Sequence, residues 1–272
     1  MNLDNINEIA EYIVSEGKGI LAADESNPTC GKRFDSIGVE SSEENRRDYR
    51  ELLFRSDGMV GNIGGVILFD ETIRQNAADG TSLVDLISSQ GALPGIKVDK
   101  GLQQMDDSEE SLTQGLDGLD ERLKEYFALG ARFTKWRAVI NIGMGLPSSE
   151  AISANMEALA DYAKIVQNNN MVPMVEPEVL MEGDHSIDAC YEATSKCLDS
   201  LFSNLSAKGV DIKGTILKPN MVTSGSAASD RASVEEVAQR TLECLKAYVP
   251  DDLPGITFLS GGQSDIDATA HL

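Results

Sequence analysis

The sequence lacks the features that would mark a membrane, secreted or nucleic-acid-binding protein. It has no run of about 18 apolar residues, and its N-terminus mixes polar and apolar residues instead of placing a basic segment before an apolar one. It also has no Lys/Arg-rich stretch, and its 23 basic residues are outnumbered by 45 acidic ones, which repel a phosphate backbone. We therefore expect neither a membrane nor nucleic acid as a partner.

Cysteine and histidine are scarce as well. The four cysteines (Cys30, Cys190, Cys197 and Cys244) have no CxxC spacing, which argues against a zinc knuckle and a disulfide framework and favours a reduced, cytoplasmic compartment. The cysteines are expected to be buried small hydrophobes. With only His185 and His271, a zinc site of three histidines is impossible, and His185 is expected to be a loop residue.

What the sequence does contain is enough apolar material for one core. The 272 residues are 41% hydrophobic with a formal charge of −22, and no repeat, low-complexity tract or long Pro/Ser-rich linker divides them. We interpret the acidic surplus as a solvated surface and residues 1–272 as a single domain.

Short apolar runs alternate with segments of helical periodicity. Apolar residues recur at helical spacing over 152–166 and 187–205, and Ser41 with Glu44 and Ser233 with Glu236 have the spacing of helix N-caps. Alternation of this kind predicts parallel strands covered by helices. Seven strands are predicted, at 19–24, 64–70, 94–99, 131–140, 171–179, 212–220 and 254–262.

Both a closed barrel and an open doubly wound sheet satisfy this alternation. No Gly-rich dinucleotide loop follows the first predicted strand, which removes the usual support for the open sheet. In a barrel the active residues come from the carboxyl ends of many strands, and charged residues occur at such positions here. The sequence therefore favours an α/β barrel.

The charged residues fall on one face of each predicted strand. Because side chains alternate across a strand, residues two positions apart share a face, so Lys135 lies with Phe133, Glu176 with Met174 and Lys218 with Ile216. The alternative is that each charge only marks where its strand emerges into water. The residues are Asp24, Lys97, Asp99, Lys135, Arg137, Glu176, Glu178 and Lys218.

Two of these charges are lysines with apolar neighbours. Lys218 lies in TILKPN and Lys135 in FTKWR, and a buried ammonium is costly unless it is paired or neutralised. Burial and a second cation lower the pKa of a lysine, which allows an amine to attack a carbonyl at neutral pH. The residues alone thus suggest a Schiff-base lysine, with the carboxylates of EPE (Glu176 and Glu178) available for proton transfer.

A phosphate site is suggested after the last predicted strand. SGGQS provides Ser260, Gly261 and Gly262, whose backbone N–H groups can approach an anion closely, although Gly-Gly is more often a simple turn. Lys32 and Arg33 could add positive charge after the first strand, or lie on a solvated helix face.

Six long motifs in order resemble one family. They are GKGILAADES (17–26), GIKVDKG (95–101), LDGLDERLKEYFALGARFTKWR (116–137), VPMVEPEVL (172–180) with GDH (183–185), ILKPNMVTSG (216–225) and GITFLSGGQS (255–264). They resemble the class I, Schiff-base fructose-1,6-bisphosphate aldolases from the first predicted helix to the last residue. The resemblance implies a (β/α)8 barrel of the TIM type, a lyase in sugar-phosphate metabolism, and no metal or other cofactor.

The resemblance also implies a role for each site residue. Lys218 matches the Schiff-base nucleophile, Glu176 the acid/base that expels water from the carbinolamine, and Glu178 its supporting carboxylate. Lys135 matches the cation that holds substrate hydroxyls, and Asp24 the carboxylate near the hydroxyl deprotonated in carbon–carbon cleavage. The implied substrate-binding set is Lys97 and Arg137, with Ser260, Gly261 and Gly262 for phosphate and Lys32 and Arg33 as additional cations.

The chain also departs from the family pattern. The family's eighth strand and C-terminal region have no counterpart after Asp267, so we expect a C-terminally truncated barrel whose first and seventh strands have open edges. Two alternatives remain: an inactive barrel that serves only in assembly or binding, and another Schiff-base lyase such as a transaldolase-like enzyme. The family implies a homotetramer and a phosphosugar substrate.

Overall fold

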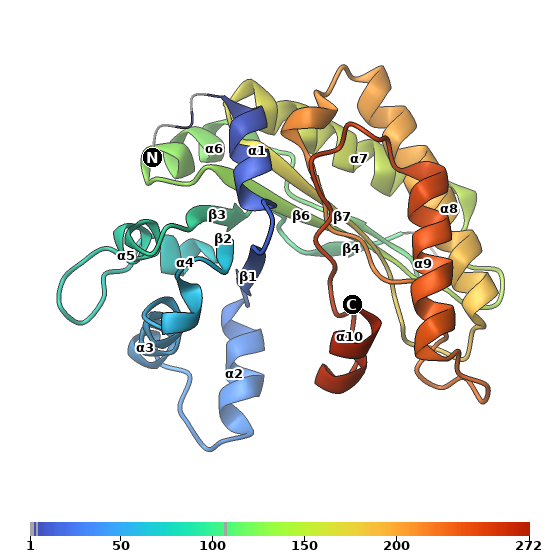
Figure 1. Ribbon diagram of the computed structural model, residues 1–272, viewed down its shortest axis with the longest axis horizontal. Helices are drawn as coiled ribbons and strands as arrows, with labels where there is room; N and C mark the ends of the chain where they lie inside the picture. The colour runs from blue at the N-terminus through green and yellow to red at the C-terminus, as the bar shows by residue number, and fades with distance from the viewer. Residues whose placement is uncertain (1–2, 4, 106–107) are drawn as a thin grey trace.

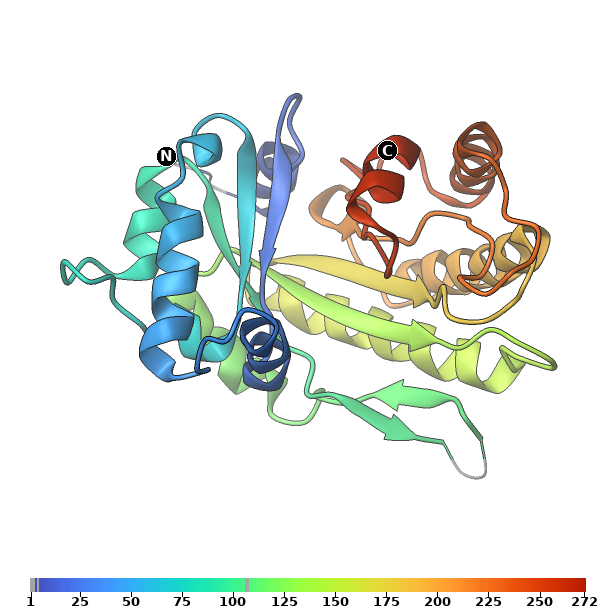
Figure 2. The ribbon, with the colours of Figure 1, turned by 90° about the horizontal axis from the view of Figure 1, so that it is seen from below.

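The computed structural model, which describes residues 3, 5–105 and 108–272, contains a sheet of six parallel strands. The sheet curls into a half-barrel with helices on its outer side (Figures 1 and 2), as the sequence predicts for a parallel α/β barrel. Its strands in spatial order are β1 (Gly19–Ala23), β2 (Ile63–Leu68), β3 (Leu93–Lys97), β6 (Phe133–Ile140), β7 (Val172–Val179) and β8 (Ile216–Leu217).

Ten α-helices are present in the described part of the chain. The two segments with predicted helical periodicity lie within α7 and α8, and α7, α8 and α9 pack side by side along the β6–β7 half of the sheet (Figure 1). None of the helices in the described part of the chain combines the length and apolarity needed to cross a membrane. The α-helices are α1 (Ile6–Ile13), α2 (Asn27–Asp35), α3 (Glu43–Phe54), α4 (Asp70–Ile73), α5 (Leu83–Ser89), α6 (Leu119–Ala128), α7 (Ser149–Asn168), α8 (Ile187–Ala207), α9 (Val234–Tyr248) and α10 (Asp265–His271), with 3₁₀ turns at Asp57–Met59 and Ile212–Gly214.

One of the two predicted N-caps is confirmed and the other is wrong by one residue. The Ser233 hydroxyl accepts a hydrogen bond from the N–H of Glu236 at the start of α9. At α3 the cap is Ser42, which accepts from the N–H of Asn45. Ser41 is unavailable because its carbonyl and hydroxyl both accept from the guanidinium of Arg46.

The strands predicted at 212–220 and 254–262 are also corrected. In the first, only β8 is a strand and it follows a 3₁₀ turn; the second pairs only briefly. Only Ile256 forms a bridge, parallel to Leu217 of β8, and the N–H of Thr257 donates to the Leu217 carbonyl at 2.9 Å. The ladder stays short because β8 ends within two residues of Pro219, which has no N–H to donate. The segment therefore follows the edge of β8 without becoming a regular strand.

A small hairpin outside the sheet was not predicted. It pairs β4 (Leu102–Gln104) with β5 (Ser111–Thr113) in antiparallel fashion. All three residues of β4 are exposed, so the strand lacks the apolar alternation on which a sequence prediction depends.

The inside of the curled sheet has its own small apolar core. It is closed at one end by α1, and three of its strand residues precede charged site residues by two positions: Phe133 before Lys135, Met174 before Glu176 and Ile216 before Lys218. The predicted sharing of faces is confirmed. The members of this inner core are Ile9, Ala10, Ile13, Ile67, Phe133, Val172, Met174 and Ile216.

A second, larger core lies between the sheet and the helices. Trp136, fully buried on the outer face of its strand, points into it and packs on Tyr162 with ring centroids 5.3 Å apart. Strands with apolar residues on both faces explain the near-continuous apolar runs in the sequence.

Candidate active site

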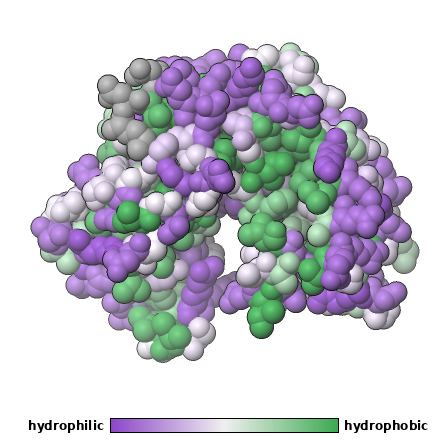
Figure 3. Space-filling view, viewed as in Figure 1, coloured by the Kyte–Doolittle hydropathy of each residue, from purple (hydrophilic) through white to green (hydrophobic). Residues whose placement is uncertain are grey.

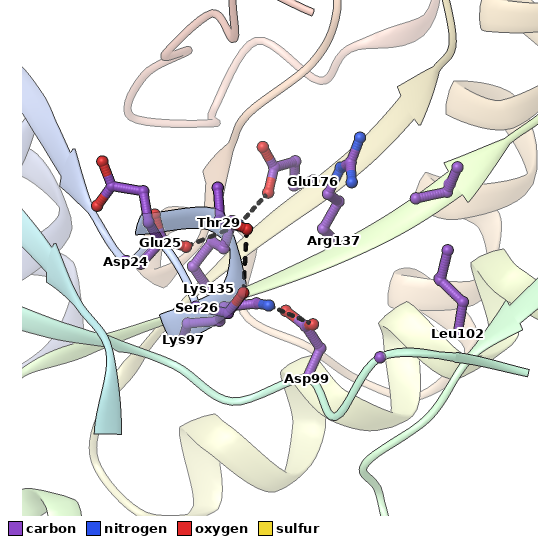
Figure 4. A pocket seen from close by; sticks show the side chains of 12 residues that line it. Asp24, Glu25, Ser26, Thr29, Lys97, Asp99, Leu102, Lys135, Arg137 and Glu176 are labelled. Atoms are coloured by element: carbon purple, nitrogen blue, oxygen red, sulfur yellow. Dashed lines mark hydrogen bonds and ion pairs between the residues drawn. The ribbon is translucent and has the colours of Figure 1, made fainter. Parts of the chain in front are cut away.

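Four charged residues from four strands meet at the carboxyl end of the half-barrel. Lys135 and Glu176 lie midway along β6 and β7, whereas Asp24 and Lys218 directly follow β1 and β8. Figure 4 shows Asp24, Lys135 and Glu176 converging from these separate strands. Parallel pairing brings the strand ends to one edge, which is how residues so distant in sequence become neighbours.

The four side chains form a continuous chain of ion pairs. The Lys135 ammonium lies 3.0 Å from an Asp24 oxygen and 3.0 Å from Oε2 of Glu176. The other Glu176 oxygen, Oε1, accepts a hydrogen bond from Lys218. Glu176 therefore bridges two lysines while its own side chain is only 3% exposed.

Burial and pairing act in opposite directions on these charges. Burial alone would raise the pKa of Asp24, but Lys135, with Lys218 and Lys97 further away, holds it below the ordinary aspartate value. Burial alone would lower the pKa of Lys135, but Glu176, Asp24 and Asp99 raise it above the ordinary lysine value. Asp24 is thus a carboxylate and Lys135 an ammonium at neutral pH.

Two further pairs flank this chain. Arg137 donates from Nε to Glu178, the second carboxylate of EPE, and this pairing raises the pKa of the guanidinium against the opposing effect of its burial. Lys97 lies 3.1 Å from Asp99 at the end of β3 (Figure 4). Both substrate-binding cations predicted from the resemblance therefore lie beside the central four residues.

The site opens into two cavities that share Glu176. One has a volume of about 320 Å³ and is lined by Asp24, Lys97, Lys135 and Arg137 among others. The other, about 650 Å³, is lined by Lys218, Glu178, Ser260 and Gly261 and by apolar residues of β1 and 256–259. The space-filling view shows a deep notch on this side of the molecule (Figure 3). Each cavity thus reaches one of the two lysines, Lys135 in the smaller and Lys218 in the larger, and Glu176 lies where the two cavities meet.

Three predicted binding residues lie apart from these cavities. Lys32 is exposed in the last turn of α2, and Arg33 pairs with Glu25 at 2.8 Å while its own side chain is 61% exposed. Gly262 follows Gly261 but lines neither cavity. Gly261 and Gly262 both have positive φ, at 61° and 85°, which explains two consecutive glycines in this turn.

Sequence reasoning missed other cavity residues. Glu25, Ser26 and Thr29 line the smaller cavity and Lys18 and Thr257 the larger one. Glu25 could have been found from its position directly after Asp24. Thr257 and Lys18 gave no such signal, because neither lies at the carboxyl end of a strand.

His185 and the four cysteines lie where the sequence suggests. His185 is in the loop just before α8, is 8% exposed, and burial lowers its pKa. All four cysteines are buried and unpaired, and burial raises the pKa of Cys197 to about 12. Among the residues that the structure describes, no three His, Cys, Asp or Glu side chains are grouped as metal ligands.

The fold and the site together define a class of protein. It is a barrel-type α/β enzyme whose strand ends place two lysines, one buried and one partly buried, on one carboxylate beside two cavities. The comparisons identify the family within this class. The family model "Fructose-bisphosphate aldolase class-I" matches residues 5–272, so the chain belongs to the class I fructose-bisphosphate aldolase family, a family of lyases.

Individual relatives agree over nearly the whole chain. The "probable fructose-bisphosphate aldolase class 1" of Xanthomonas campestris pv. campestris is 54% identical over 100% of this chain and 82% of its own. The cytosolic fructose-bisphosphate aldolase 6 of Arabidopsis thaliana is 51% identical over 97% of this chain and 74% of its own. The solved fructose-bisphosphate aldolase of Plasmodium falciparum, in complex with TRAP and a small-molecule inhibitor, is 46% identical with a TM-score of 0.96, covering 98% of this chain and 78% of that one.

Proposed function

We propose that this chain reversibly cleaves fructose-1,6-bisphosphate into dihydroxyacetone phosphate and glyceraldehyde-3-phosphate through a Schiff base on Lys218. The observation that carries the proposal is the bridge from Lys218 through Glu176 to Lys135, at the meeting point of two cavities. The names of the relatives supply the substrate.

The first stage forms the covalent intermediate. Glu176 takes a proton from the Lys218 ammonium, and the amine adds to the substrate ketone to give a carbinolamine. Glu176 then returns a proton to the carbinolamine hydroxyl, which leaves as water and yields the protonated Schiff base. Glu178, on the same face of β7, supports this exchange while it holds Arg137.

The second stage breaks the carbon–carbon bond. Asp24, a carboxylate held by Lys135, takes the proton of the substrate's C4 hydroxyl. The C3–C4 bond breaks, the aldehyde leaves, and the electron pair moves into the Schiff base to form an enamine. Protonation at C3 and hydrolysis then release dihydroxyacetone phosphate and restore Lys218.

The cations around the site hold the anionic substrate. Lys97 and Arg137 lie on the side of the smaller cavity, and Ser260 and Gly261, with Gly262, offer a phosphate-binding turn beside Lys218. Lys32 and Arg33 contribute only long-range charge, since both are exposed on α2. Such local cations are needed because the net charge of −22 repels phosphate groups.

Borohydride trapping tests the proposal. Dihydroxyacetone phosphate is added, the Schiff base is reduced, and peptide mass spectrometry locates the adduct. We expect the added mass on Lys218, its loss in Lys218→Met, and its retention in Lys213→Met, a matched control on the exposed turn just before β8. A folded sample with no adduct would favour the inactive-barrel alternative, whereas preference for a different phosphosugar would favour the transaldolase-like one.

The setting of the enzyme is part of the same proposal. We infer a cytoplasmic enzyme from the relatives named as cytosolic, and a single-domain subunit of a homotetramer from the family resemblance. Analytical ultracentrifugation measures the assembly directly, and a monomer at cellular concentration would contradict it.

A further inference from the structure

Arg50, on α3, is a fully buried arginine that contacts the end of β1. Its Nε donates to the carbonyl of Ala23 at 3.1 Å and its Nη2 to the carbonyl of Glu25 at 2.7 Å. These two carbonyls flank Asp24 on either side in the chain. One rigid guanidinium therefore fixes both peptide groups next to the carboxylate that pairs with Lys135.

This arrangement is costly by itself. The Arg50 side chain is 0% exposed, it pairs with the Glu25 carboxylate at 3.6 Å, and its Nη1 has no hydrogen-bond partner among the residues that the structure describes. Burying a cation with incomplete pairing opposes folding, and an apolar side chain of similar volume would avoid the cost. The contacts that Arg50 makes with the end of β1 must therefore have a role beyond packing.

The neighbouring residue on α3 holds the same segment. Tyr49 donates from its hydroxyl to Oε1 of Glu25 at 3.2 Å, and Arg33 of α2 pairs with that same oxygen. Residues 23–25 are thus attached to α3 by backbone and side chain together. Asp24 and Glu25 both line the smaller cavity, but of these three residues it is Asp24 whose carboxylate pairs with Lys135.

We propose that Arg50 is a positioning residue for Asp24: it fixes the backbone on both sides of that carboxylate so that the carboxylate meets Lys135 and the substrate hydroxyl. This inference rests on the function proposed for Asp24 in carbon–carbon cleavage. It assigns Arg50 no contact with substrate, because Arg50 lies outside both site cavities.

The same helix supplies a matched control. Arg46 lies one turn before Arg50, is also buried, and pairs with both carboxylate oxygens of Glu71, at 2.8 and 2.6 Å. Its other partner is Ser41, so none of its side-chain hydrogen bonds reaches the β1 end. A general loss of α3 packing affects variants at both positions, whereas loss of Asp24 placement affects only Arg50.

The experiment compares Arg50→Lys and Arg50→Gln with Arg46→Lys and Arg46→Gln. Fructose-1,6-bisphosphate cleavage is measured across pH, and the dihydroxyacetone phosphate adduct on Lys218 is quantified in the same samples. For Arg50→Gln we expect kcat to fall roughly ten- to a hundredfold, the scale for a displaced reacting group, with the adduct at the wild-type level. Arg50→Lys, which keeps one charged donor, should recover part of the rate, and both Arg46 variants should keep the wild-type pH profile.

The pH profile separates positioning from plain destabilisation. The charged groups that face Asp24 are Lys135 of β6, Lys97 of β3 and Lys218 after β8, and all three favour its ionised form. If Asp24 moves away from Lys135, it ionises at higher pH, so the acid limb of kcat should shift upward in the Arg50 variants.

Each other outcome overturns the inference. Arg50 would have only a structural role if its folded variants kept the wild-type rate and pH profile. The same conclusion would follow if the Arg46 variants changed equally, or if both Arg50 variants failed to fold. A wild-type protein that forms no adduct on Lys218 would instead reject the function proposed above, and the two failures are thus distinguishable.

Discussion

At the scale of the residue, Asp24 links the stability of the fold to pH. Its folded-state pKa lies below the ordinary value of about 3.9. A carboxyl group with a lowered folded-state pKa stabilises the fold. This stabilisation is complete above the pKa of the unfolded state and is lost as pH falls through the pKa of the folded state. The free energy of unfolding should therefore fall below about pH 4, and Asp24→Asn should make that dependence shallower.

Denaturant titrations between acid and neutral pH measure this slope. Asp35→Asn, at the exposed end of α2, is the control and should keep the wild-type slope. If Asp24→Asn and Asp35→Asn gave the same acid dependence, the coupling of Asp24 to Lys135 would be too weak to account for the lowered pKa. Lys135 acts at the alkaline end of the pH scale. Its contribution to the free energy of unfolding is complete below the ordinary lysine pKa and is lost as pH rises through the raised folded-state pKa.

Residues on strands were easier to find from sequence than residues that support them. The face shared by Phe133 and Lys135, or by Met174 and Glu176, follows from the two-residue period of a strand. Arg50 was missed because it lies on a different element from Asp24, and the period of α3 reveals only which of its faces is buried. No local pattern tells which backbone carbonyl a buried guanidinium will meet.

At the scale of the element, the packing of β3 on β6 depends on the absence of a side chain at Gly95. A Cβ there would lie 2.3 Å from the Phe133 ring, in the inner core of the half-barrel. Gly95→Ala should therefore destabilise the protein by about 1–3 kcal/mol, the usual cost of overpacking. Gly143→Ala, where an added Cβ meets nothing within 4 Å, should be nearly neutral.

Urea denaturation of both variants and of Gly95→Ala combined with Phe133→Leu checks this prediction. The smaller side chain at 133 should recover part of the loss, which is the non-additivity expected of residues in contact. Full additivity would show that the two residues do not compete for the same space.

The elements that sequence predicted well are those with a strong period over many residues. Residues 152–166 repeat apolar positions at helical spacing for four turns, and they lie inside α7. The segment 254–262 contains the apolar residues Ile256, Phe258 and Leu259 but forms only one bridge, because pairing depends on the length of its neighbour β8. Composition cannot reveal how long a neighbouring strand will be.

At the scale of the whole molecule, the parallel α/β class is predicted by the alternation of strand-like and helical apolar patterns along the chain. The curled, barrel-like sheet is predicted by the charged residues at the ends of many strands. The family resemblance then supplied the roles that physical reasoning had left open. What sequence did not settle is how strongly each part of the sheet is held, because that depends on which strands have two neighbours. Among the described residues, β6 and β7 are paired on both sides and β1 only with β2.

Hydrogen exchange should therefore be graded across the sheet. An amide exchanges when its hydrogen bond opens, and local opening costs least where a strand has one partner and few buried contacts. Amides of β1 and of 256–259 should exchange first, and those of β6 and β7, which are buried along almost their whole length, last. Equal protection of β1 and β6 would mean that the edge of β1 is covered in solution, for example by a second copy of the chain, and repeating the measurement at several protein concentrations distinguishes that case.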